Sequence, residues 1–434
     1  LFLCFCATGR ADNPIIQTCF TADPAPMVHD GVVYLYVGHD EDDARGFKMF
    51  DWKCFTSTDM VNWTDRGAVL STGTFAWATK NSAWASQCIF RNGKFYFYCT
   101  AAQRINGTMS IGVAVSNSPT GPFVDAIGKP LISNSREDID PTVFIDDDGQ
   151  AYMYWGNPNL YYVKLNEDMI SYSGEVVKSS VKPRNYQEGP WFYKRNGHYY
   201  MAYASTCCPE GIGYAMSDSP TGPWPFKGQI MDPHRLSDGN HPGIIDYKGK
   251  TYIFGFNYEL NWEISDVKRE RRSVCVAEMT YNPDGTIPKL PWWTKEGVAQ
   301  VGTFNPFQQV EGATICYSDD IKTAPREDGR PGVFVRAMEN GAYIKIKGVD
   351  FGDSGATNFL ANVAALSEGT SIALRVGSET GRTIGILKVK PTGGLDKWET
   401  QSCKITGARG VQDLYLKFFG NGTPVMNLDW WKFE

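Results

Sequence analysis

The amino-acid sequence predicts an all-β protein whose larger part is a five-bladed β-propeller and whose smaller part is a second, strand-rich domain. The prediction depends on a repeated hairpin, the lack of convincing amphipathic helices in the sequence, and a change of texture near residue 300. At roughly 150 residues per domain, a chain of 434 residues allows two or three domains. We place the two domains at residues 13–300 and 305–434.

Five segments share one pattern, in which an apolar strand is followed by a turn with glycine and by a second strand rich in tyrosine and phenylalanine. Glycine supplies the positive φ that tight hairpin turns need. The turn glycines are 48 to 62 residues apart, about the length of a four-stranded blade with its loops. They are Gly31, Gly93, Gly149, Gly197 and Gly249. A further segment, residues 118–123, recurs at 219–224, two blades later. The competing fold, a two-sheet sandwich, would not repeat one hairpin in this way.

Charged and aromatic residues stand eight or nine positions before these glycines. The first strand of each blade lines the axis of a propeller, so residues that enter these strands face one pocket. They are Asp23, Trp84 with Ala85, Asp140, Glu188 and His241. Crowded carboxylates repel one another, which raises the pKa of at least one and leaves another ionised. An acid and a base then coexist near neutral pH, as glycoside hydrolysis requires.

Each of these residues also has an ordinary structural interpretation. Asp23 and Asp140 precede proline, a common pairing at turns and strand entries. Trp84 either stacks on a sugar ring or packs in the channel. His241 is a metal or water ligand, a hydrogen-bond donor to substrate, or a structural histidine. Their coincidence at one blade position favours a functional site.

Composition and charge exclude some partners. The net charge is −6, with 42 Lys+Arg against 48 Asp+Glu and no long basic run, so we expect no nucleic acid. Residues 1–7 resemble the end of a signal segment, too short to span a membrane, and predict a secreted, periplasmic or cell-surface protein. A lipid-attachment site at Cys4 is the alternative. We expect a monomer.

The 11 cysteines show no paired C-x-x-C spacing that would indicate zinc. The adjacent Cys207 and Cys208 are interpreted as small buried apolar residues, with a disulfide as the alternative.

The acidic segments, their order and their register with the blades closely resemble glycoside hydrolase family 43 over about residues 13 to 295. The segments are Ala22-Asp23-Pro24-Ala25-Pro26, Asp138-Ile139-Asp140-Pro141-Thr142, Glu188-Gly189-Pro190-Trp191 and Gly239-Asn240-His241-Pro242-Gly243. The resemblance implies a five-bladed propeller enzyme that inverts configuration on xylan- and arabinan-derived substrates. It implies Asp23 as the general base, Glu188 as the general acid, and Asp140 as the residue that orients Glu188 and raises its pKa.

The same resemblance implies further contacts near the axis. His241 matches a histidine that in many members coordinates a calcium ion or its water shell, and no organic cofactor is expected. Arg271 and Arg272 resemble an arginine that contacts substrate; Arg272 is preferred, and a solvated pair is the alternative.

Beyond about residue 300, several segments resemble a carbohydrate-binding module of family 6. They are Gln309-Val310-Glu311-Gly312-Ala313, Lys347-Gly348-Val349-Asp350-Phe351-Gly352, Gly410-Val411-Gln412-Asp413-Leu414-Tyr415-Leu416 and Asn427-Leu428-Asp429-Trp430-Trp431-Lys432-Phe433. The resemblance implies a β-sandwich, a jelly roll, that binds xylan or related glucans. Tyr343 and Trp398 would sandwich a sugar, and Asn427 would hydrogen-bond it.

Family 6 modules also imply a structural calcium ion. Its ligands here would be Gln309, Glu311 and Asp429. Only one of Trp430 and Trp431 can face outward on a strand, so the other belongs to the core. An inert spacer is the alternative for this domain.

Together these observations predict an inverting exo-glycosidase of hemicellulose, a β-1,4-xylosidase with α-L-arabinofuranosidase activity. The expected partners are xylan, xylo-oligosaccharides or arabinoxylan. Within the class, the alternative is an arabinofuranosidase that debranches arabinoxylan. From other classes, the alternatives are a non-catalytic protein that binds plant polysaccharide and a retaining propeller enzyme of the invertase type. The anomer formed first separates inversion, retention and simple binding.

Overall fold

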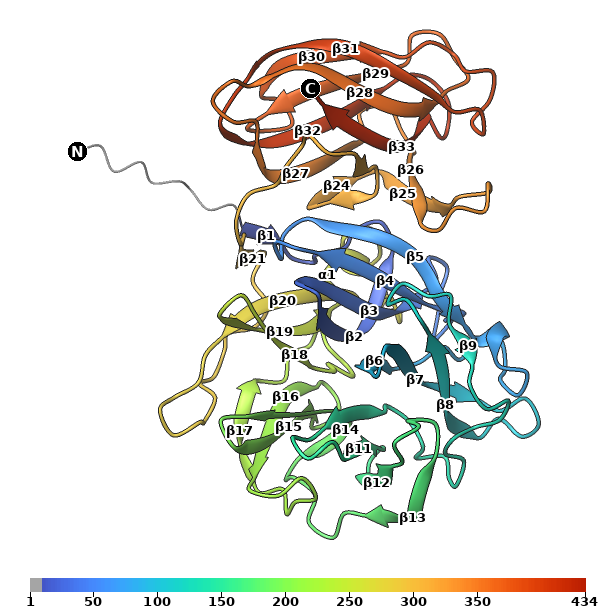
Figure 1. Ribbon diagram of the computed structural model, residues 1–434, viewed down its shortest axis with the longest axis vertical. Coiled ribbons are helices and arrows are strands. Elements are labelled where there is room, and N and C mark those ends of the chain that lie inside the picture. Colours follow the sequence, from blue (N-terminus) through green and yellow to red (C-terminus); the bar gives the residue numbers. More distant parts are fainter. Residues whose placement is uncertain (1–9) are drawn as a thin grey trace. The chain divides into compact units, whose positions relative to one another are not determined.

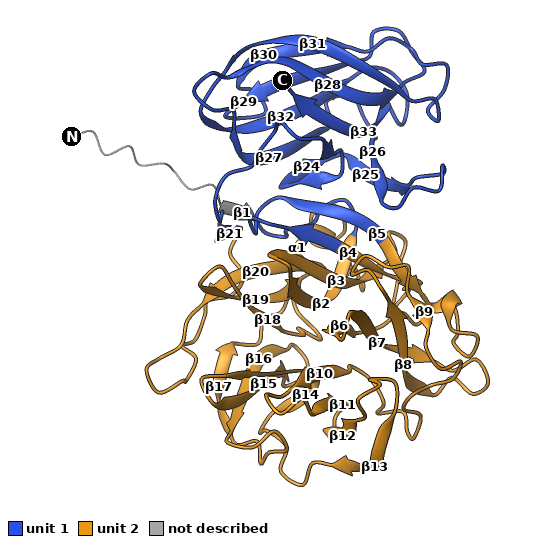
Figure 2. Ribbon diagram, in the orientation of Figure 1, with its two compact units in different colours: residues 1–19, 55–67, 295–434 blue, residues 20–54, 68–294 orange. Residues whose placement is uncertain are grey.

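The computed structural model describes residues 10–434 and is all-β, with strands as almost all of its elements. The chain forms two compact units, which Figure 2 colours separately. Unit 1 holds residues 10–19, 55–67 and 295–434, and unit 2 holds residues 20–54 and 68–294. The predicted signal segment and Cys4 lie outside the described residues. Within residues 10–434, no helix is long and apolar enough to cross a membrane.

Five antiparallel sheets follow one another along residues 20–279 (Figure 1). The first two contain β2 (Phe20–His29), β3 (Val32–Asp40), β4 (Asp51–Ser57) and β5 (Trp63–Ser71), then β6 (Ser86–Arg91), β7 (Lys94–Ala102), β8 (Met109–Ser116) and β9 (Val124–Asp125). The next two contain β10 (Thr142–Ile145), β11 (Ala151–Trp155), β12 (Tyr161–Leu165) and β13 (Tyr172–Lys178), then β14 (Tyr186–Arg195), β15 (His198–Ser205), β16 (Gly211–Ser217) and β17 (Phe226–Met231). The fifth contains β18 (Gly243–Tyr247), β19 (Lys250–Asn257) and β20 (Ser273–Met279). The helical elements of the described chain are η1 (Thr72–Thr74) and α1 (Glu259–Ile264).

The five predicted hairpins are present, each joining the first two strands of a sheet. All five turn glycines have φ between +73° and +84°. In four of the turns the residue before the glycine also has positive φ, the geometry of a type I′ turn. The third turn is longer because Ile145 pairs with Ala151, which leaves residues 146–150 as the loop.

The repeated segments 118–123 and 219–224 have equivalent contacts. The Tyr36 hydroxyl of the first sheet donates to the Pro119 carbonyl at 2.7 Å, and the Tyr154 hydroxyl of the third sheet donates to the Pro220 carbonyl at 2.7 Å. Each segment therefore attaches its sheet to a buried tyrosine of the preceding one.

Residues 310–433 contribute two further antiparallel sheets, which share one apolar core. The first contains β22 (Val310–Glu311), β25 (Ile321–Pro325), β26 (Val333–Ala337), β28 (Ala356–Ala364), β31 (Glu399–Ala408) and β33 (Met426–Phe433). The second contains β24 (Tyr317–Asp319), β27 (Tyr343–Asp350), β29 (Ser371–Val376), β30 (Arg382–Lys388) and β32 (Val411–Phe419). Also in unit 1, β1 (Arg10–Asp12) pairs with β21 (Glu296–Ala299), and β23 (Thr314–Ile315) pairs with the start of β5. Trp431 is buried in the core and Trp430 is half-buried, as adjacent strand positions require.

Cys207 and Cys208 are joined by a disulfide and are exposed, so their interpretation as buried apolar residues is wrong. They lie in the loop between β15 and β16 instead of in a strand. Cys88, Cys99 and Cys275, which do lie in strands, are buried.

Candidate active site

A pocket of about 430 Å³ in unit 2 brings the predicted axis residues together. It is lined by Asp23, Trp84, Asp140, Glu188, His241 and Arg272, all six of the residues predicted for the first domain. They come from all five sheets or from the segments that enter them. The blade-position argument therefore selected residues that share one pocket.

The backbone is irregular at each of the three residues that carry the carboxylates. Asp23 and Asp140 have φ of +50° and +59°, a left-handed conformation that costs of order 1–3 kcal/mol for a residue other than glycine. Asp23 also lies where the pairing of β2 with β3 shifts register, and Glu188 lies where the pairing of β14 with β15 does so. Such bulges turn a side chain away from the regular sheet face. Strain at these positions indicates that side-chain direction matters more than local stability.

His241 lies between the three carboxylates. Its Nδ1 is 3.2 Å from Asp23 Oδ1, and its Nε2 is 3.8 Å from Asp140 Oδ2 and 3.7 Å from Glu188 Oε1. Burial disfavours its charged form, but the charges of Asp23 and Asp140 and the hydrogen bond to Glu188 raise the pKa of His241 to about 10. The imidazolium form is therefore the form present at neutral pH.

The proton distribution differs from the predicted one. Burial raises the pKa of Asp140 to about 7, and the charges of Glu188 and Asp23 add to this effect against that of His241. Burial also acts to raise the pKa of Glu188, but His241 and the Asn157 amide outweigh it and lower that pKa below its ordinary value. His241, which sequence reasoning did not include as a positive charge, therefore acts on Glu188 against any increase of its pKa, and the role of Asp140 in raising that pKa stays a prediction.

Arg272 is buried and bridges two carboxylates. Its Nη1 donates to Asp23 Oδ1 at 3.1 Å, while its Nη2 and Nε donate to the two oxygens of Asp40 at 2.9 and 3.0 Å. Arg271 points elsewhere, with its Nε donating to the Ala44 carbonyl at 3.2 Å. The preference for Arg272 over Arg271 as a pocket residue agrees with this geometry, and a solvated pair does not.

Trp84 has an aromatic neighbour that the sequence did not indicate. It is half-buried, and its ring centroid is 5.9 Å from that of Phe47, which is 52% exposed and lines the same pocket. The Arg272 guanidinium lies 5.2 Å from the Phe47 ring centroid. The two rings form an apolar side of the pocket, which suits contact with a sugar ring as well as packing.

Several polar residues at the site escaped sequence reasoning because they lie outside the repeated strand entries. Asn157 donates to Glu188 Oε2, and Gln187 donates to Asn157 Oδ1 at 3.1 Å. Asp40, fully buried, is the main partner of Arg272, and the buried Glu210 also lines the pocket. No repeated spacing marks these positions, although Asn157-Pro158 follows the apolar strand β11 and Asp40 ends β3.

Asp140, Glu188 and His241 offer ligand atoms within 4.8 Å of one another. Two carboxylates and one imidazole at this spacing suit a divalent cation only when His241 has lost the proton that it holds at neutral pH. Calcium takes six to eight oxygen ligands, so water would have to complete its shell here.

Comparison with known proteins agrees with this chemistry. Residues 11–287 match the family model described as Glycosyl hydrolases family 43. The chain belongs to this family. It is therefore a glycoside hydrolase, and the family resemblance predicted from its acidic segments is confirmed. Residues 311–434 match the model described as Carbohydrate binding module (family 6), which confirms the second resemblance.

Some relatives of the family 43 enzyme are similar over nearly the whole chain, and others over less than two thirds of it. An arabinoxylan arabinofuranohydrolase of Paenibacillus polymyxa is 31% identical over 480 residues, which cover 97% of this chain and 74% of that protein. A xylosidase/arabinosidase of Bacteroides ovatus is 31% identical over 316 residues, 62% of this chain and 94% of that protein. The crystal structure of a family 43 arabinoxylan arabinofuranohydrolase from Bacillus subtilis in complex with cellotetraose superposes with a TM-score of 0.85 at 29% identity, covering 97% of each chain.

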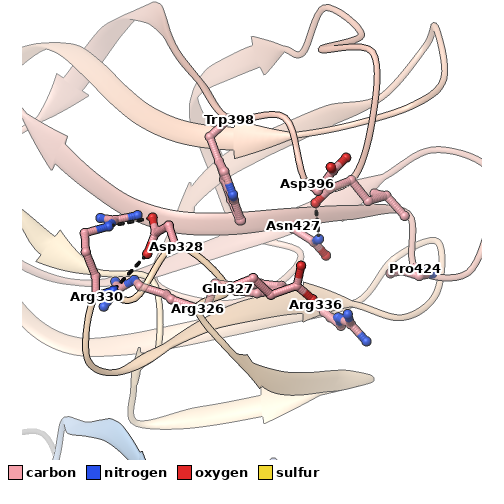
Figure 3. Close-up of a pocket in the computed structure, with 11 residues that line it drawn as sticks. Arg326, Glu327, Asp328, Arg330, Arg336, Asp396, Trp398, Pro424 and Asn427 are labelled. Carbon is pink, nitrogen blue, oxygen red and sulfur yellow. Dashed lines mark hydrogen bonds and ion pairs between the residues drawn. The ribbon is translucent and has the colours of Figure 1, made fainter.

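The family 6 module has a pocket of its own, of about 460 Å³ (Figure 3). Trp398 is half-buried and points into it, and its ring meets Phe334 edge-on at a centroid distance of 5.2 Å. Asn427 is buried and donates to the Leu395 carbonyl at 2.8 Å, while its Oδ1 has no hydrogen-bond partner among the described residues. An aromatic ring and an unsatisfied amide oxygen are the groups that a sugar needs.

Tyr343 does not share this pocket with Trp398. It lies on β27 in the other sheet, where its ring is 6.2 Å from Tyr317 and 6.0 Å from Tyr415. The predicted sandwich of Tyr343 and Trp398 is therefore wrong, and Phe334 is the aromatic neighbour of Trp398. Phe334 is remote from Trp398 in sequence, so no spacing pattern pointed to it.

The predicted calcium ligands of the family 6 module also have other partners. Arg326 Nε donates to Asp429 Oδ1 at 2.7 Å, and its Nη2 pairs with Glu311. Arg330 Nη2 donates to Asp429 Oδ2 at 3.0 Å, and Gln309 is exposed. These residues do not fit a calcium ion in this structure, because the guanidinium of Arg326 lies between the two carboxylates and compensates their charge.

Proposed function

We propose that this family 43 enzyme is an inverting, exo-acting α-L-arabinofuranosidase that removes arabinose side chains from arabinoxylan. The assignment of the substrate depends on one observation, the similarity over 97% of the chain, both domains included, to an arabinoxylan arabinofuranohydrolase. The pocket supports the chemistry, because a single cavity of about 430 Å³ collects the three carboxylates. A second candidate, β-1,4-xylosidase, is supported by the similarity of the first domain to a xylosidase/arabinosidase.

In the proposed reaction, Asp23 takes a proton from a water molecule whose oxygen attacks the anomeric carbon. Glu188 gives a proton to the glycosidic oxygen as the bond from that oxygen to the anomeric carbon breaks. The sugar leaves with inverted configuration, and both carboxyl groups then exchange protons with solvent to return to their starting forms. Glu188 suits the role of acid because its side chain is 19% exposed, against 5% for Asp140, so a glycosidic oxygen can reach it.

Protons for Glu188 come from a coupled group. His241 lies within 4 Å of both Asp140 and Glu188. Asp140 and His241 both hold protons near neutral pH. Groups this close titrate together. We propose that Asp140 orients Glu188 through this group, and that Arg272 holds Asp23 as the base.

The test of the proposed function compares two aryl glycosides. Nitrophenyl α-L-arabinofuranoside should be cleaved with a higher kcat/KM than nitrophenyl β-D-xyloside, and arabinoxylan should release arabinose. The opposite order would favour the xylosidase. Proton NMR of the first-formed anomer should show inversion; retention would overturn the assignment of Asp23 as a base, and the lack of any product would favour a binding protein.

We also propose that the five sheets are the blades of a propeller. Their first strands contact one another in sequence, β2 with β6, β6 with β10 and β10 with β14, and β18 contacts β2. The shared core of the two C-terminal sheets supports a β-sandwich of the jelly-roll type. The family matches support a catalytic domain at residues 13–300 and a module at 305–434 that binds xylan or arabinoxylan.

Three further proposals concern setting and cofactors. An exposed disulfide supports export, because disulfides persist mainly in oxidising compartments. That the protein is a monomer stays a prediction. A calcium ion or its water shell would be held near His241, whose imidazole would first have to lose its proton.

A further inference from the structure

One side of the catalytic pocket has no part in the reaction described above. It is formed by Glu210 and by the disulfide of Cys207 and Cys208. Glu210 immediately precedes β16, and its backbone is fixed on both sides: its N–H donates to the Ser237 carbonyl at 2.9 Å, and its carbonyl accepts from the His234 N–H at 3.4 Å. Its carboxyl group is therefore held in place and not carried by a free loop.

The Glu210 carboxyl borders the same space as Glu188. A Cβ placed on Gly239 would lie 3.4 Å from Glu188 Oε1 and 3.9 Å from Glu210 Oε2. Glu210 is only 1% exposed, yet its Oε2 has no hydrogen-bond partner among the described residues. A buried polar atom without a partner is unfavourable, so a ligand that supplies a hydrogen bond there gains by doing so.

Glu210 Oε2 offers an acceptor to a ligand in the pocket. Glu210 lines the pocket, and no described residue donates a hydrogen bond to its Oε2. Sugar hydroxyls donate hydrogen bonds, so they match this oxygen.

The disulfide adds an apolar surface beside this group. The sulfur atoms of Cys207 and Cys208 and a carboxyl oxygen of Glu210 lie within 4.8 Å of one another, and both cysteines are exposed. Sulfur is polarizable and packs well against apolar groups. The loop of the disulfide follows β15, whose Ala204 pairs with Glu188 of β14, so disulfide and Glu188 lie at the same end of one sheet.

We propose that the Cys207–Cys208 disulfide and Glu210 form a binding wall for the pentose unit held beside Glu188. The two sulfur atoms pack against the C–H face of the sugar, and Glu210 Oε2 hydrogen-bonds one of its hydroxyls. The inference deepens the proposed function and rests on it, since the sugar is the one whose glycosidic bond Glu188 protonates.

Two variants of Glu210 separate binding from other roles. Glu210→Leu removes the hydrogen bond and should raise KM about tenfold on the better aryl pentoside, with kcat within about threefold of wild type. Glu210→Gln keeps a side-chain oxygen that can accept the same hydrogen bond, and KM should stay within about twofold. Melting temperatures show whether either variant is folded. Unchanged KM in folded Glu210→Leu, or loss of kcat with normal KM, would overturn the role of Glu210 in binding.

The disulfide is tested by a double variant and by reduction. Cys207→Ser with Cys208→Ser should raise KM about fivefold, and dithiothreitol should do the same to wild type but have no further effect on the double variant. Cys403→Ser, which alters a half-buried thiol in unit 1, is the matched control and should leave KM unchanged. Unchanged KM in the double variant would overturn the role of the disulfide in the binding wall and leave the proposed function standing. A wild-type enzyme inactive on both aryl pentosides overturns the proposed function as well.

Discussion

Replacing Arg272 by methionine should destabilise the protein strongly, because the guanidinium compensates two buried carboxylates. Its side chain is 5% exposed, and those of Asp23 and Asp40 are 5% and 0% exposed. Removing one partner of a buried ion pair costs about 3–5 kcal/mol, since the remaining charge is left without compensation. At about 2–4 °C per kcal/mol for a domain of this size class, the melting temperature should fall by about 6 to 20 °C.

The stability lost in Arg272→Met should depend on pH in a definite direction. Without Arg272, burial makes ionised Asp40 unfavourable, so the variant gains stability whenever a proton binds Asp40 in the folded state. The folded variant then binds more protons than the unfolded chain, and its stability falls as pH rises. Thermal unfolding followed by circular dichroism at pH 5 and pH 8 should therefore show the larger deficit relative to wild type at pH 8.

Neighbouring and compensating variants make the test specific. Arg271→Met removes a guanidinium that donates to the Ala44 carbonyl, and it should cost about 1 kcal/mol or less. Adding Asp40→Asn to Arg272→Met should restore part of the stability, because one of the uncompensated charges is gone. If Arg272→Met loses no more stability than Arg271→Met, or loses the same amount at both pH values, the assignment of Arg272 as the counter-charge is refuted.

Three other predictions concern activity. Asp23→Asn and Glu188→Gln should each reduce turnover of an aryl arabinofuranoside by at least about a thousandfold while the protein stays folded; near-normal turnover would remove that residue from the mechanism. In wild type, kcat/KM should fall as pH rises through about 7, where Asp140 loses its proton; in Asp140→Asn this fall should be absent, and its persistence would point to another group. Trp398→Ala should weaken binding to insoluble arabinoxylan without changing turnover of the small substrate, since tethering matters only for polymers; a change in small-substrate turnover would contradict a separate binding site.

The sequence predicted the parts of the fold and site that repeat. Five glycine turns gave the hairpins, and counting back from them gave Asp23, Asp140, Glu188 and His241, because equivalent positions in repeated sheets enter the same space. The pairing of Trp398 with Tyr343 failed, since aromatic contacts across a domain follow strand order, which no local pattern encodes. Glu210 was missed because it precedes the third strand of its sheet, whereas the sequence argument counted back only from the turns between the first and second strands.

Counter-charges were the least predictable feature, and both units show why. Arg272 bonds Asp40 across 232 positions of sequence, and Arg326 bonds Asp429 across 103. In unit 2 the sequence pointed to Arg272 as a contact of the substrate but missed its main partner, Asp40. In unit 1 the motifs marked Glu311 and Asp429 but not Arg326, so a calcium ion was assigned where Arg326 lies. A planar guanidinium has several donors in a fixed fork, which lets one side chain bridge two carboxylates. The carboxylates of a motif therefore specify chemistry only together with the arginine that faces them.

In unit 2, Asp23 contacts two cations, Arg272 at 3.1 Å and His241 at 3.2 Å. Among the described residues, Glu188 pairs with one cation, His241, at 3.7 Å. This unequal sharing of positive charge gives the two carboxylates different environments, which is the physical basis for assigning one as base and the other as acid.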